Sequence, residues 1–383
     1  MIYKTIRFDP TLAIFNVDNR ILDSLMSNPP PAPLTPDALA VFTALYAAAN
    51  DVWRAAPWTF LNETQLFGVQ DPNSDQIGFV SIMGALGEHF ALDVYLDEEG
   101  LFGFIKLQES EPLNIRESIF EIPQIQLSFE RKALLFKEEK NLFKALGLTY
   151  KGNEPWPSAR SIRPGCYPWI VDPDEAVFLT HCLRQTINVT ARAQHEPELL
   201  PELTSPPTVR VRVPERCDGA LKWKDEVQSF THPESMPAVV TVPFAALAAL
   251  SALKPARQII EADFFMAPMG IGKEHDRRMC AYILLIADRK SGTILAHDVM
   301  TAQPSLEQMR QNAASLLMNK LAELKLRPSE IRVRSPWLHQ GLKSAAQTLR
   351  FALSVSPQLP MVDMARDGML QQFMGEAPED TPE

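Results

Sequence analysis

Residues 66–107, LFGVQDPNSDQIGFVSIMGALGEHFALDVYLDEEGLFGFIKL, decide the fold of the first half of the chain. They contain three apolar runs, at 77–83, 90–96 and 101–105, with short turns rich in Gly, Asp and Glu between them. Runs of that length and spacing predict an antiparallel meander. In the second run apolar residues occupy every other position, which predicts a strand with one buried face and one more loosely covered face.

The glycines at 84–87, GALG, predict a turn rather than a phosphate-binding loop. A phosphate loop needs a helix N-terminus directly after the glycines, so that amides and dipole point at the anion, and here a strand is predicted to follow. The meander therefore predicts the core of a sheet but no catalytic or phosphate-binding site.

Length and composition predict a globular protein of two domains. The 383 residues suffice for two cores, and 46% hydrophobic with 22% charged residues are ordinary values for a soluble protein. The longest apolar run, 238–253, is interrupted by Pro243 and is too short to span a bilayer. Because residues 1–7 also lack the apolar core of a secretion signal, we expect a cytoplasmic protein with no membrane partner.

The cysteines and histidines form no zinc motif. Cys166, Cys182, Cys217 and Cys280 include no Cys-x-x-Cys pair, and no histidines cluster near them. We expect reduced, mostly buried thiols and no cofactor.

The net charge of −10 is unevenly distributed. Residues 1–207 carry 16 basic and 27 acidic side chains, whereas residues 208–370 carry 21 basic and 16 acidic ones. The overall sign argues against nucleic-acid binding by the whole chain, but not by the basic C-terminal half. Two domains of complementary charge explain the asymmetry equally well, so both alternatives stay open.

Proline-rich segments at 28–33 and 191–207 are typical of linkers. We therefore predict an N-terminal arm and linker at 1–34, an α+β domain at 35–190, a linker at 191–207, a second domain at 208–373 and a disordered acidic tail at 374–383.

Capping residues place the helices of the first domain. Thr35 before Pro36 predicts a helix over 35–53 that covers the buried face of the meander. Asp172 and Glu175 form a capping-box pattern for a helix that runs to about residue 187. The other elements expected here are strands at 2–8 and 125–129, a helical patch at 113–120 and a helix at 137–146 that ends at Gly147.

The second half of the chain predicts regularly spaced strands and helices. A strand at 259–265 is followed by a hairpin of two strands, at 279–288 and 293–300. Ser305 then caps a long amphipathic helix. The other elements expected are strands at 208–213, 221–230, 330–333 and 351–355, and helices at 243–253, 335–350 and 361–373, the last with Met361, Met364 and Phe373 inward.

The segment 156–169, dense in Pro, Arg and aromatic residues, predicts an ordered loop. Its arginines and tryptophans make it a candidate binding surface for an anion or a peptide, through Trp156, Arg160, Arg163 and Trp169. The alternative, which we favour, is that the tryptophans cover the core and the arginines pair with nearby acids.

Motifs spread over the chain are DVW at 51–53, PW at 57–58, FGV at 67–69, GALGEHF at 84–90, RPG at 163–165, PW at 168–169 and EADFF at 261–265. In these the chain resembles an uncharacterised bacterial family with two tandem domains of unknown function. The resemblance covers nearly the whole chain from about residue 36 and implies no known activity.

Residues 259–355 carry a second resemblance. A strand with an internal Asp263, a hairpin, a long helix, a short strand and a helix follow one another in the order of the ribonuclease-H-like fold, in its integrase and transposase branch. The resemblance implies a mixed-sheet α/β domain in which Asp263 corresponds to a metal-binding aspartate and Asp288 to an acid at the hairpin. Clustered carboxylates in that family hold divalent ions, Mg or Mn, that activate water against a phosphodiester.

The chain departs from this family where the second catalytic aspartate is expected. The residues after the fourth strand are RVRSP at 332–336, and two arginines oppose the binding of a cation. Ser335 is expected to cap the next helix. A third acid could be Asp363 or Asp367, and Asp263 alone could be a structural aspartate.

Glu88, His89 and Asp93 form one more candidate constellation, because His89 and Asp93 share a strand face. No Ser or Cys nucleophile stands in a strained turn beside them, so a hydrolase triad is not indicated. A small-molecule hydrolase here requires a pocket.

Together these observations favour a non-catalytic binding or interaction protein, with an unknown protein or small ligand as partner. The alternative is a divalent-metal-dependent nuclease or other nucleic-acid-processing enzyme that uses Asp263 and Asp288. The two hypotheses differ in one geometric prediction, since the enzyme needs a third carboxylate close to Asp263.

Overall fold

The computed structural model describes residues 35–109, 119–152, 154–200, 203–232, 243–272 and 277–374. These residues divide into two compact units, the first comprising 35–164 and 168–232, the second 165–167 and 243–374. Each unit has helices packed on a sheet, so the predicted α+β fold with two domains is confirmed. The strand predicted at 2–8, most of the helical patch at 113–120 and the acidic tail lie outside the described residues.

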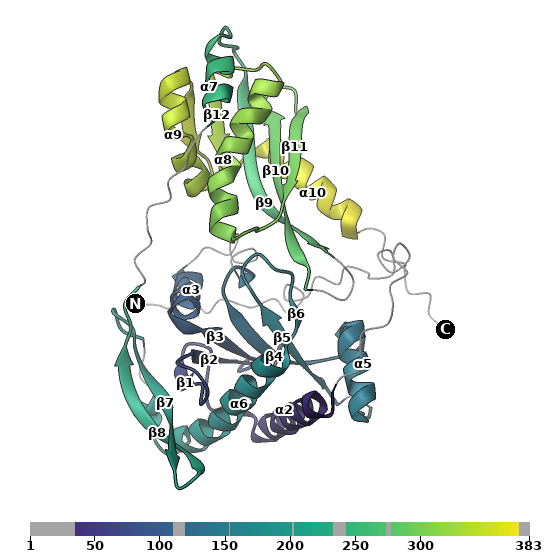
Figure 1. The fold of residues 1–383 in the computed structure, drawn as a ribbon, viewed down its shortest axis with the longest axis vertical. Coiled ribbons are helices and arrows are strands. Elements are labelled where there is room, and N and C mark those ends of the chain that lie inside the picture. The colour runs from purple at the N-terminus through teal and green to yellow at the C-terminus, as the bar shows by residue number, and fades with distance from the viewer. Residues whose placement is uncertain are drawn as a thin grey trace. The chain divides into compact units, whose positions relative to one another are not determined.

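The first unit is built on a sheet of eight strands in the order β6-β5-β4-β3-β2-β1-β7-β8 (Figure 1). Neighbouring strands are antiparallel except β1 and β7, which pair in parallel. The strands are β1 (Phe67–Gln70), β2 (Ile77–Met83), β3 (Ala91–Leu96), β4 (Gln124–Glu130), β5 (Trp156–Ile162), β6 (Trp169–Ile170), β7 (Thr208–Cys217) and β8 (Ala220–Ser229).

The predicted meander is correct for β2 and β3, and Gly84 and Gly87 form the predicted turn between them with positive φ angles. Its third strand is wrong, because residues 97–109 form the helix α3 (Asp97–Glu109). Leu101, Phe104 and Leu107 are buried at a spacing of three, which fits a helix face. Acidic residues in the first turn suit the positive end of the helix dipole.

Helices cover one face of this sheet at the predicted positions. α2 (Pro36–Ala55) begins at Thr35, whose hydroxyl accepts a hydrogen bond from the amide of Ala38, and α6 (Pro173–Ala193) begins with the predicted capping box of Asp172 and Glu175. Both bury apolar residues against the sheet face of Leu92 and Val94. A shorter helix, α5 (Lys137–Leu146), ends at Gly147 in the left-handed conformation, as predicted. The 3₁₀ turns are η2 (Pro57–Thr59), η3 (Lys132–Leu134) and η4 (Pro197–Leu199).

The structure differs from the predicted domain boundary at 191–207. α6 runs on to Ala193, and β7 and β8 join the first sheet through β1 instead of opening the second unit. Asp225 of β8 ties them to α6, because its carboxylate accepts hydrogen bonds from Arg192, Arg210 and Arg212. Proline marks irregular backbone, and sequence composition does not show which sheet the following strands join.

The segment at 156–169 is also not a single loop, since it contains the seven-residue strand β5 and the start of β6. Every residue of β5 is buried, with Arg160 opposite Gln126 of β4. Pro and Arg at strand positions conceal the alternation of faces in the sequence.

The second unit contains a sheet of five strands in the order β11-β10-β9-β12-β13. β9 (Ile259–Ile271), β10 (Met279–Asp288) and β11 (Ile294–Met300) are antiparallel neighbours. β12 (Glu330–Val333) and β13 (Ala352–Val355) run parallel to β9. The element order is the one predicted from the sequence, and the resemblance to the ribonuclease-H-like fold stays a prediction.

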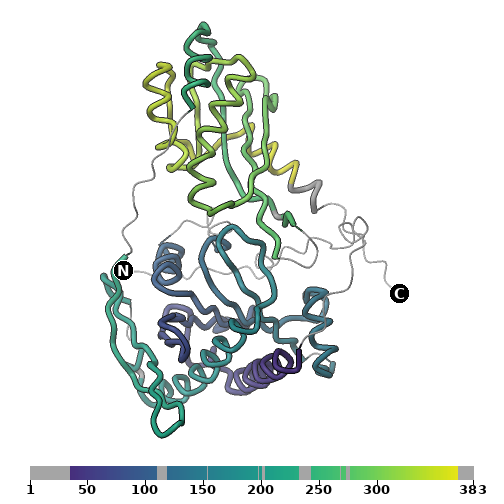
Figure 2. The backbone as a smooth tube through the Cα atoms, in the orientation of Figure 1, coloured from purple at the N-terminus to yellow at the C-terminus, as the bar shows by residue number. Residues whose placement is uncertain are grey.

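Helices cover both faces of this sheet (Figures 1 and 2). α7 (Phe244–Ser251), α8 (Leu306–Glu323) and α9 (Pro336–Leu349) pack on one face, with Leu284 and Ile331. α10 (Pro360–Met374) packs on the other, where Val362 meets Phe265 and Ile283. Met364 was expected to point inward but is 61% exposed, while Phe373 has a side chain outside the described part.

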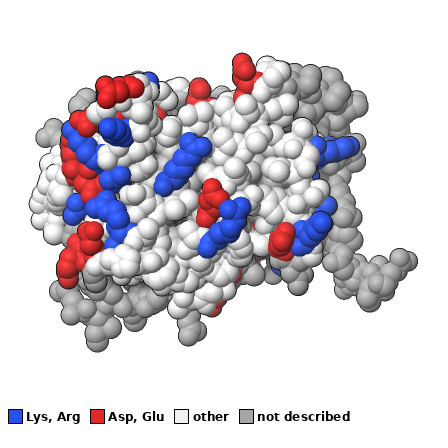
Figure 3. Space-filling model, turned by 90° about the horizontal axis from the view of Figure 1, so that it is seen from below, with Lys and Arg blue, Asp and Glu red and all other residues white. Residues whose placement is uncertain are grey.

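Charged residues on the face drawn in Figure 3 are mixed in sign, and they are densest on the side of β7 and β8. Within this pair of strands, Lys224 of β8 pairs with Glu215 of β7 and with Glu226 of β8. Among the described residues no helix is long and apolar enough to cross a membrane.

Candidate functional site

The residues proposed for chemistry gather on the α10 face of the second sheet. Because side chains alternate along a strand, Glu261 and Asp263 of β9 share this face, and Ile260 and Ala262 enter the core on the other. Glu261 lies opposite Arg332 of the parallel strand β12, so Arg332 and the following Arg334 extend the same surface. We call this set the polar face: Glu261, Asp263, Glu330, Arg332, Arg334 and Asp363.

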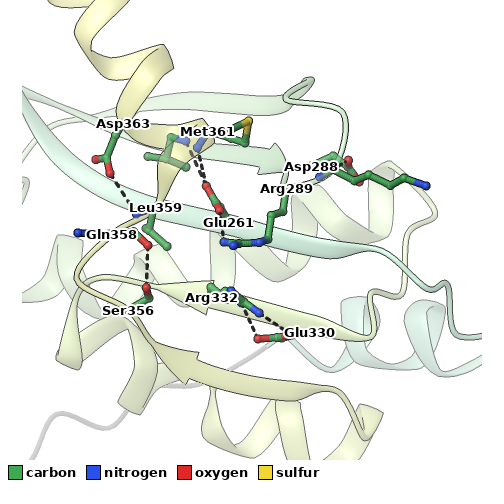
Figure 4. Close-up of polar contacts among 12 residues, drawn as sticks. Glu261, Asp288, Arg289, Glu330, Arg332, Ser356, Gln358, Leu359, Met361 and Asp363 are labelled. Carbon is green, nitrogen blue, oxygen red and sulfur yellow. Dashed lines mark hydrogen bonds and ion pairs between the residues drawn. The ribbon is translucent and has the colours of Figure 1, made fainter.

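Glu261 holds the N-terminus of α10 against the sheet. Its side chain is completely buried, and one carboxylate oxygen accepts a hydrogen bond of 2.8 Å from the amide of Met361 (Figure 4). The other oxygen accepts one of 2.9 Å from the guanidinium of Arg289. A carboxylate at a helix N-terminus is stabilised by the free amides and the helix dipole, so this contact positions α10.

Asp263 is buried beneath Arg334. The distance between its carboxylate and the guanidinium is 3.2 Å. Burial raises the pKa of Asp263 to about 6, against the opposing effect of the Arg334 charge.

Arg334 lies between two carboxylates. It follows β12 directly, and its guanidinium also donates to Asp363 of α10. Asp363 in turn accepts a hydrogen bond from the amide of Leu359, just before that helix. The guanidinium of Arg334 therefore neutralises both Asp263 and Asp363.

Glu330 and Arg332 complete the polar face at the start of β12. Their side chains are 2.6 Å apart, and the hydroxyl of Ser354 on β13 donates to Glu330 at 3.4 Å. The polar face thus pairs its acids with arginines instead of concentrating negative charge.

Asp288 lies away from the polar face, which corrects the predicted pairing with Asp263. It is opposite Ile260 in the register, and cross-strand partners share a face, so Asp288 and Asp263 belong to opposite faces of the sheet. Figure 4 shows Asp288 at the far end of the site from Asp363. Its carboxylate accepts from the amides of Lys290 and Ser291, and these turn contacts hold its pKa below the usual range.

Ser335 occupies the N-cap position of α9, but its side chain makes no capping hydrogen bond there. The predicted capping role is therefore wrong in its chemistry, although the helix begins where expected.

The predicted binding residues of the first unit have structural partners. Trp156 is 8% exposed and contacts the rings of Phe143 and Tyr150, as expected of a core tryptophan. Arg160 is 6% exposed and donates to Glu139 at 3.1 Å, and its guanidinium stacks 4.0 Å above the ring of Phe136.

The other two members of that set are more accessible. Arg163 pairs with Asp172 at 2.8 Å and with Glu175 at 2.7 Å, at the start of α6. Trp169 is half-buried and stacks near Phe136. The alternative that we favoured from the sequence describes this arrangement, and a binding role for Arg163 and Trp169 stays a prediction.

The constellation of Glu88, His89 and Asp93 is not assembled. The imidazole of His89 lies 4.0 Å from Glu130, and burial lowers its pKa. Asp93 accepts instead from the amide group of Gln126 at 2.8 Å. Burial raises the pKa of Asp93 to about 6.

Sequence reasoning missed Glu261 and the bridging role of Arg334. The spacing of Glu261 and Asp263 by two residues in an apolar strand was a usable signal, because it places two acids on one face. The contact between Arg334 and Asp363 joins positions 29 residues apart, which no local pattern indicates.

The acids of the polar face do not form a site for a divalent metal pair. A metal pair needs several carboxylates around one point. Within the described ranges, no group of three or more His, Cys, Asp or Glu side chains is arranged to hold an ion. Arg334 stands between the acids that would supply it, so the residues do not fit this metal site.

Comparisons with known proteins identify domains and no activity. The profile of a domain of unknown function, DUF7309, matches residues 42–209, and that of a second, DUF6930, matches residues 246–370. Searches of curated proteins and of solved structures found no match. As predicted, the chain belongs to an uncharacterised family that carries two domains of unknown function in tandem.

Proposed function

We propose that this protein is a non-catalytic binding protein and that its second unit does not cleave nucleic acid. The observation that carries the proposal is the position of Arg334 between Asp263 and Asp363. A guanidinium keeps its positive charge at any physiological pH, so it competes permanently with a divalent ion for these carboxylates.

The positive charge of Arg334 would repel a divalent ion bound to the same carboxylates. At 4 Å, two unit charges of the same sign repel by about 4 kcal/mol at an effective dielectric constant of 20, and a divalent ion doubles that value. This penalty applies in full only while Arg334 remains in place. The metal-dependent nuclease is the less favoured reading for this reason, and because Asp288 faces the other side of the sheet.

The partner of such a binding protein follows from its accessible surfaces. An unknown protein or small ligand would contact the exposed Arg163 and the half-buried Trp169 of the first unit. A nucleic acid would be attracted to the basic residues of the second unit.

Calorimetric titration of manganese tests the proposal. We expect no binding at micromolar manganese by the wild-type protein or by Asp263→Asn. In Arg334→Ala two carboxylates lose their shared cation, and weak manganese binding should appear. Lys343→Ala, at an exposed lysine of α9, is the control for a lost positive charge.

A micromolar site in the wild type that disappears in Asp263→Asn contradicts the proposal. So does magnesium-dependent cleavage of DNA or RNA by the wild type that Asp263→Asn abolishes.

A further inference from the structure

Five exposed basic residues lie at one end of the second sheet. Lys254 and Arg257 precede β9, Lys325 precedes β12, Arg350 precedes β13, and Lys290 follows β10. Because β12 and β13 run parallel to β9 while β10 runs antiparallel to it, all of these positions meet at the same edge. We call Lys254, Arg257, Lys290, Lys325 and Arg350 the basic end.

Hydrogen bonds between the connecting segments hold this end together. The amide of Ala256 donates to the carbonyl of Arg327 at 2.8 Å, and that of Ala352 donates to the carbonyl of Ser329 at 2.9 Å. The amide of Arg289 donates to the carbonyl of Ile259 at 3.0 Å. The five basic residues are therefore carried by connections that are fixed to one another.

The acids near the basic end already have partners. Asp288 is 4% exposed, and its carboxylate accepts a hydrogen bond from the amide of Ser291 in the turn. Glu330 forms an ion pair with Arg332. Glu323, at the end of α8, lies 3.7 Å from Lys320. None of the five side chains of the basic end makes an ion pair with any residue that the structure describes.

Helix dipoles do not account for so much positive charge. The C-termini of α7, α8 and α9 lie at this end, and each is equivalent to about −0.5 charge, about −1.5 in total. Arg327 already compensates part of this negative charge, because its guanidinium donates hydrogen bonds to the carbonyls of Leu349 and Leu253. The basic end adds five further charges, which leaves a clear positive excess.

Two of these residues occupy backbone positions that favour glycine. Lys325, after α8, has φ of 51°, and Arg350, after α9, has φ of 54°. A residue with a side chain pays roughly 1 kcal/mol in this region, and helices usually end there in Gly or Asn. A basic side chain at both helix ends is therefore not what the backbone prefers.

We propose that the basic end is a docking site for the phosphate backbone of a nucleic acid. This inference rests on the proposed function in one respect, namely that the second unit binds a nucleic acid without cleaving it. Adjacent strands are about 4.8 Å apart, so the four strand ends from β10 to β13 span roughly 14 Å. Phosphates along one strand of a duplex advance about 3.4 Å each, so the row covers about four such steps, which join about five phosphates.

The surroundings favour a nucleic acid over a protein or a membrane. Protein interfaces have an apolar centre, and the large apolar side chains exposed near this end are Leu324 and Ile294, which are single residues at the ends of α8 and β11. Among the described residues of the second unit, 243–272 and 277–374, there are 15 basic and nine acidic side chains.

Fluorescence anisotropy with the full chain tests this inference, using a labelled 30-base-pair DNA duplex and a 30-nucleotide RNA at 50 to 200 mM salt. About five phosphate contacts predict a slope of log affinity against log salt near −4.5 on duplex, or about 500-fold weaker binding over that range. The double variant Arg257→Glu/Lys325→Glu should reduce the slope by about 2 and weaken binding at least tenfold.

Matched variants and probes separate the outcomes. Arg216→Glu/Lys222→Glu, the same two charge reversals at exposed residues of β7 and β8 in the first unit, should leave binding within twofold of the wild type. Lack of binding to both nucleic acids at 50 mM salt overturns the inference, as does equal loss in the control and double variants. Binding to vesicles with 30% phosphatidylserine, but not to nucleic acid, also overturns it.

The state of the probe distinguishes this inference from the proposed function. Intact nucleic acid on a denaturing gel after incubation with magnesium is expected. Cleaved probe with normal binding overturns the non-catalytic proposal and leaves the docking site standing. Intact but unbound probe overturns only the docking site.

Discussion

Replacing Glu261 by glutamine should loosen α10 from the second sheet. The carboxylate is completely buried and receives both the guanidinium of Arg289 and the amide of Met361. The neutral amide keeps the shape of the side chain but removes the charge. One of its two terminal groups also becomes a donor that faces a donor.

The cost follows from these contacts. A hydrogen bond to a charged group contributes about 1.5–3 kcal/mol, and a charge at a helix N-terminus about 0.3–1 kcal/mol. Because Arg289 is partly exposed, water can replace part of its hydrogen bond to Glu261. We therefore take a value towards the lower end of the hydrogen-bond range. A destabilisation of about 2 kcal/mol remains, which corresponds to roughly 30-fold faster amide exchange by local opening.

Hydrogen exchange of the wild type and Glu261→Gln measures this directly. Exchange should accelerate over 360–369 in α10, and the helix α2 of the first unit should be unchanged. Glu307→Gln, at an acid of α8 whose side chain contacts Gln311, is the matched control and should have no effect. Equal protection of α10 in all three proteins would show that Glu261 does not hold this helix on the sheet.

Three further changes test the buried polar groups and one close backbone approach. Asp93→Asn should stabilise the first unit at pH 7 by up to about 3 kcal/mol, and the gain should disappear at pH 4 in urea unfolding at the two pH values. The reason is that burial raises the pKa of Asp93 in the folded protein to about 6, above the ordinary aspartate value of 3.8, so its ionisation costs stability as pH rises between these values. Arg160→Met should destabilise by about 3–5 kcal/mol in the same assay, since it leaves the buried carboxylate of Glu139 without its cation. Gly165→Ala should lower the melting temperature, because a Cβ at its φ of 76° would lie 2.2 Å from that of Ala302; an unchanged melting curve contradicts this.

Elements whose signals are local could be predicted from the sequence. Thr35 before Pro36 marked the start of α2, and Asp172 with Glu175 the capping box of α6. Gly147 ended α5 where a left-handed residue was required. These elements were predictable because a cap acts within about four residues.

The faces and neighbours of the elements depend on contacts between residues that are distant in the sequence. Residues 97–109 form α3 instead of a strand because this helix packs on Phe79 and Tyr95 of the sheet. β7 and β8 joined the first sheet through two residue pairs with β1, which composition does not encode.

The candidate site divides in the same way. Alternation along β9 was visible in the sequence and places Glu261 and Asp263 together, while the register with β10 places Asp288 on the opposite face. The position of Arg334 between Asp263 and Asp363 depends on how α10 packs on the sheet. Strand register and helix packing are fixed by contacts between distant residues, so the three-dimensional structure was needed to see that an arginine neutralises these acids.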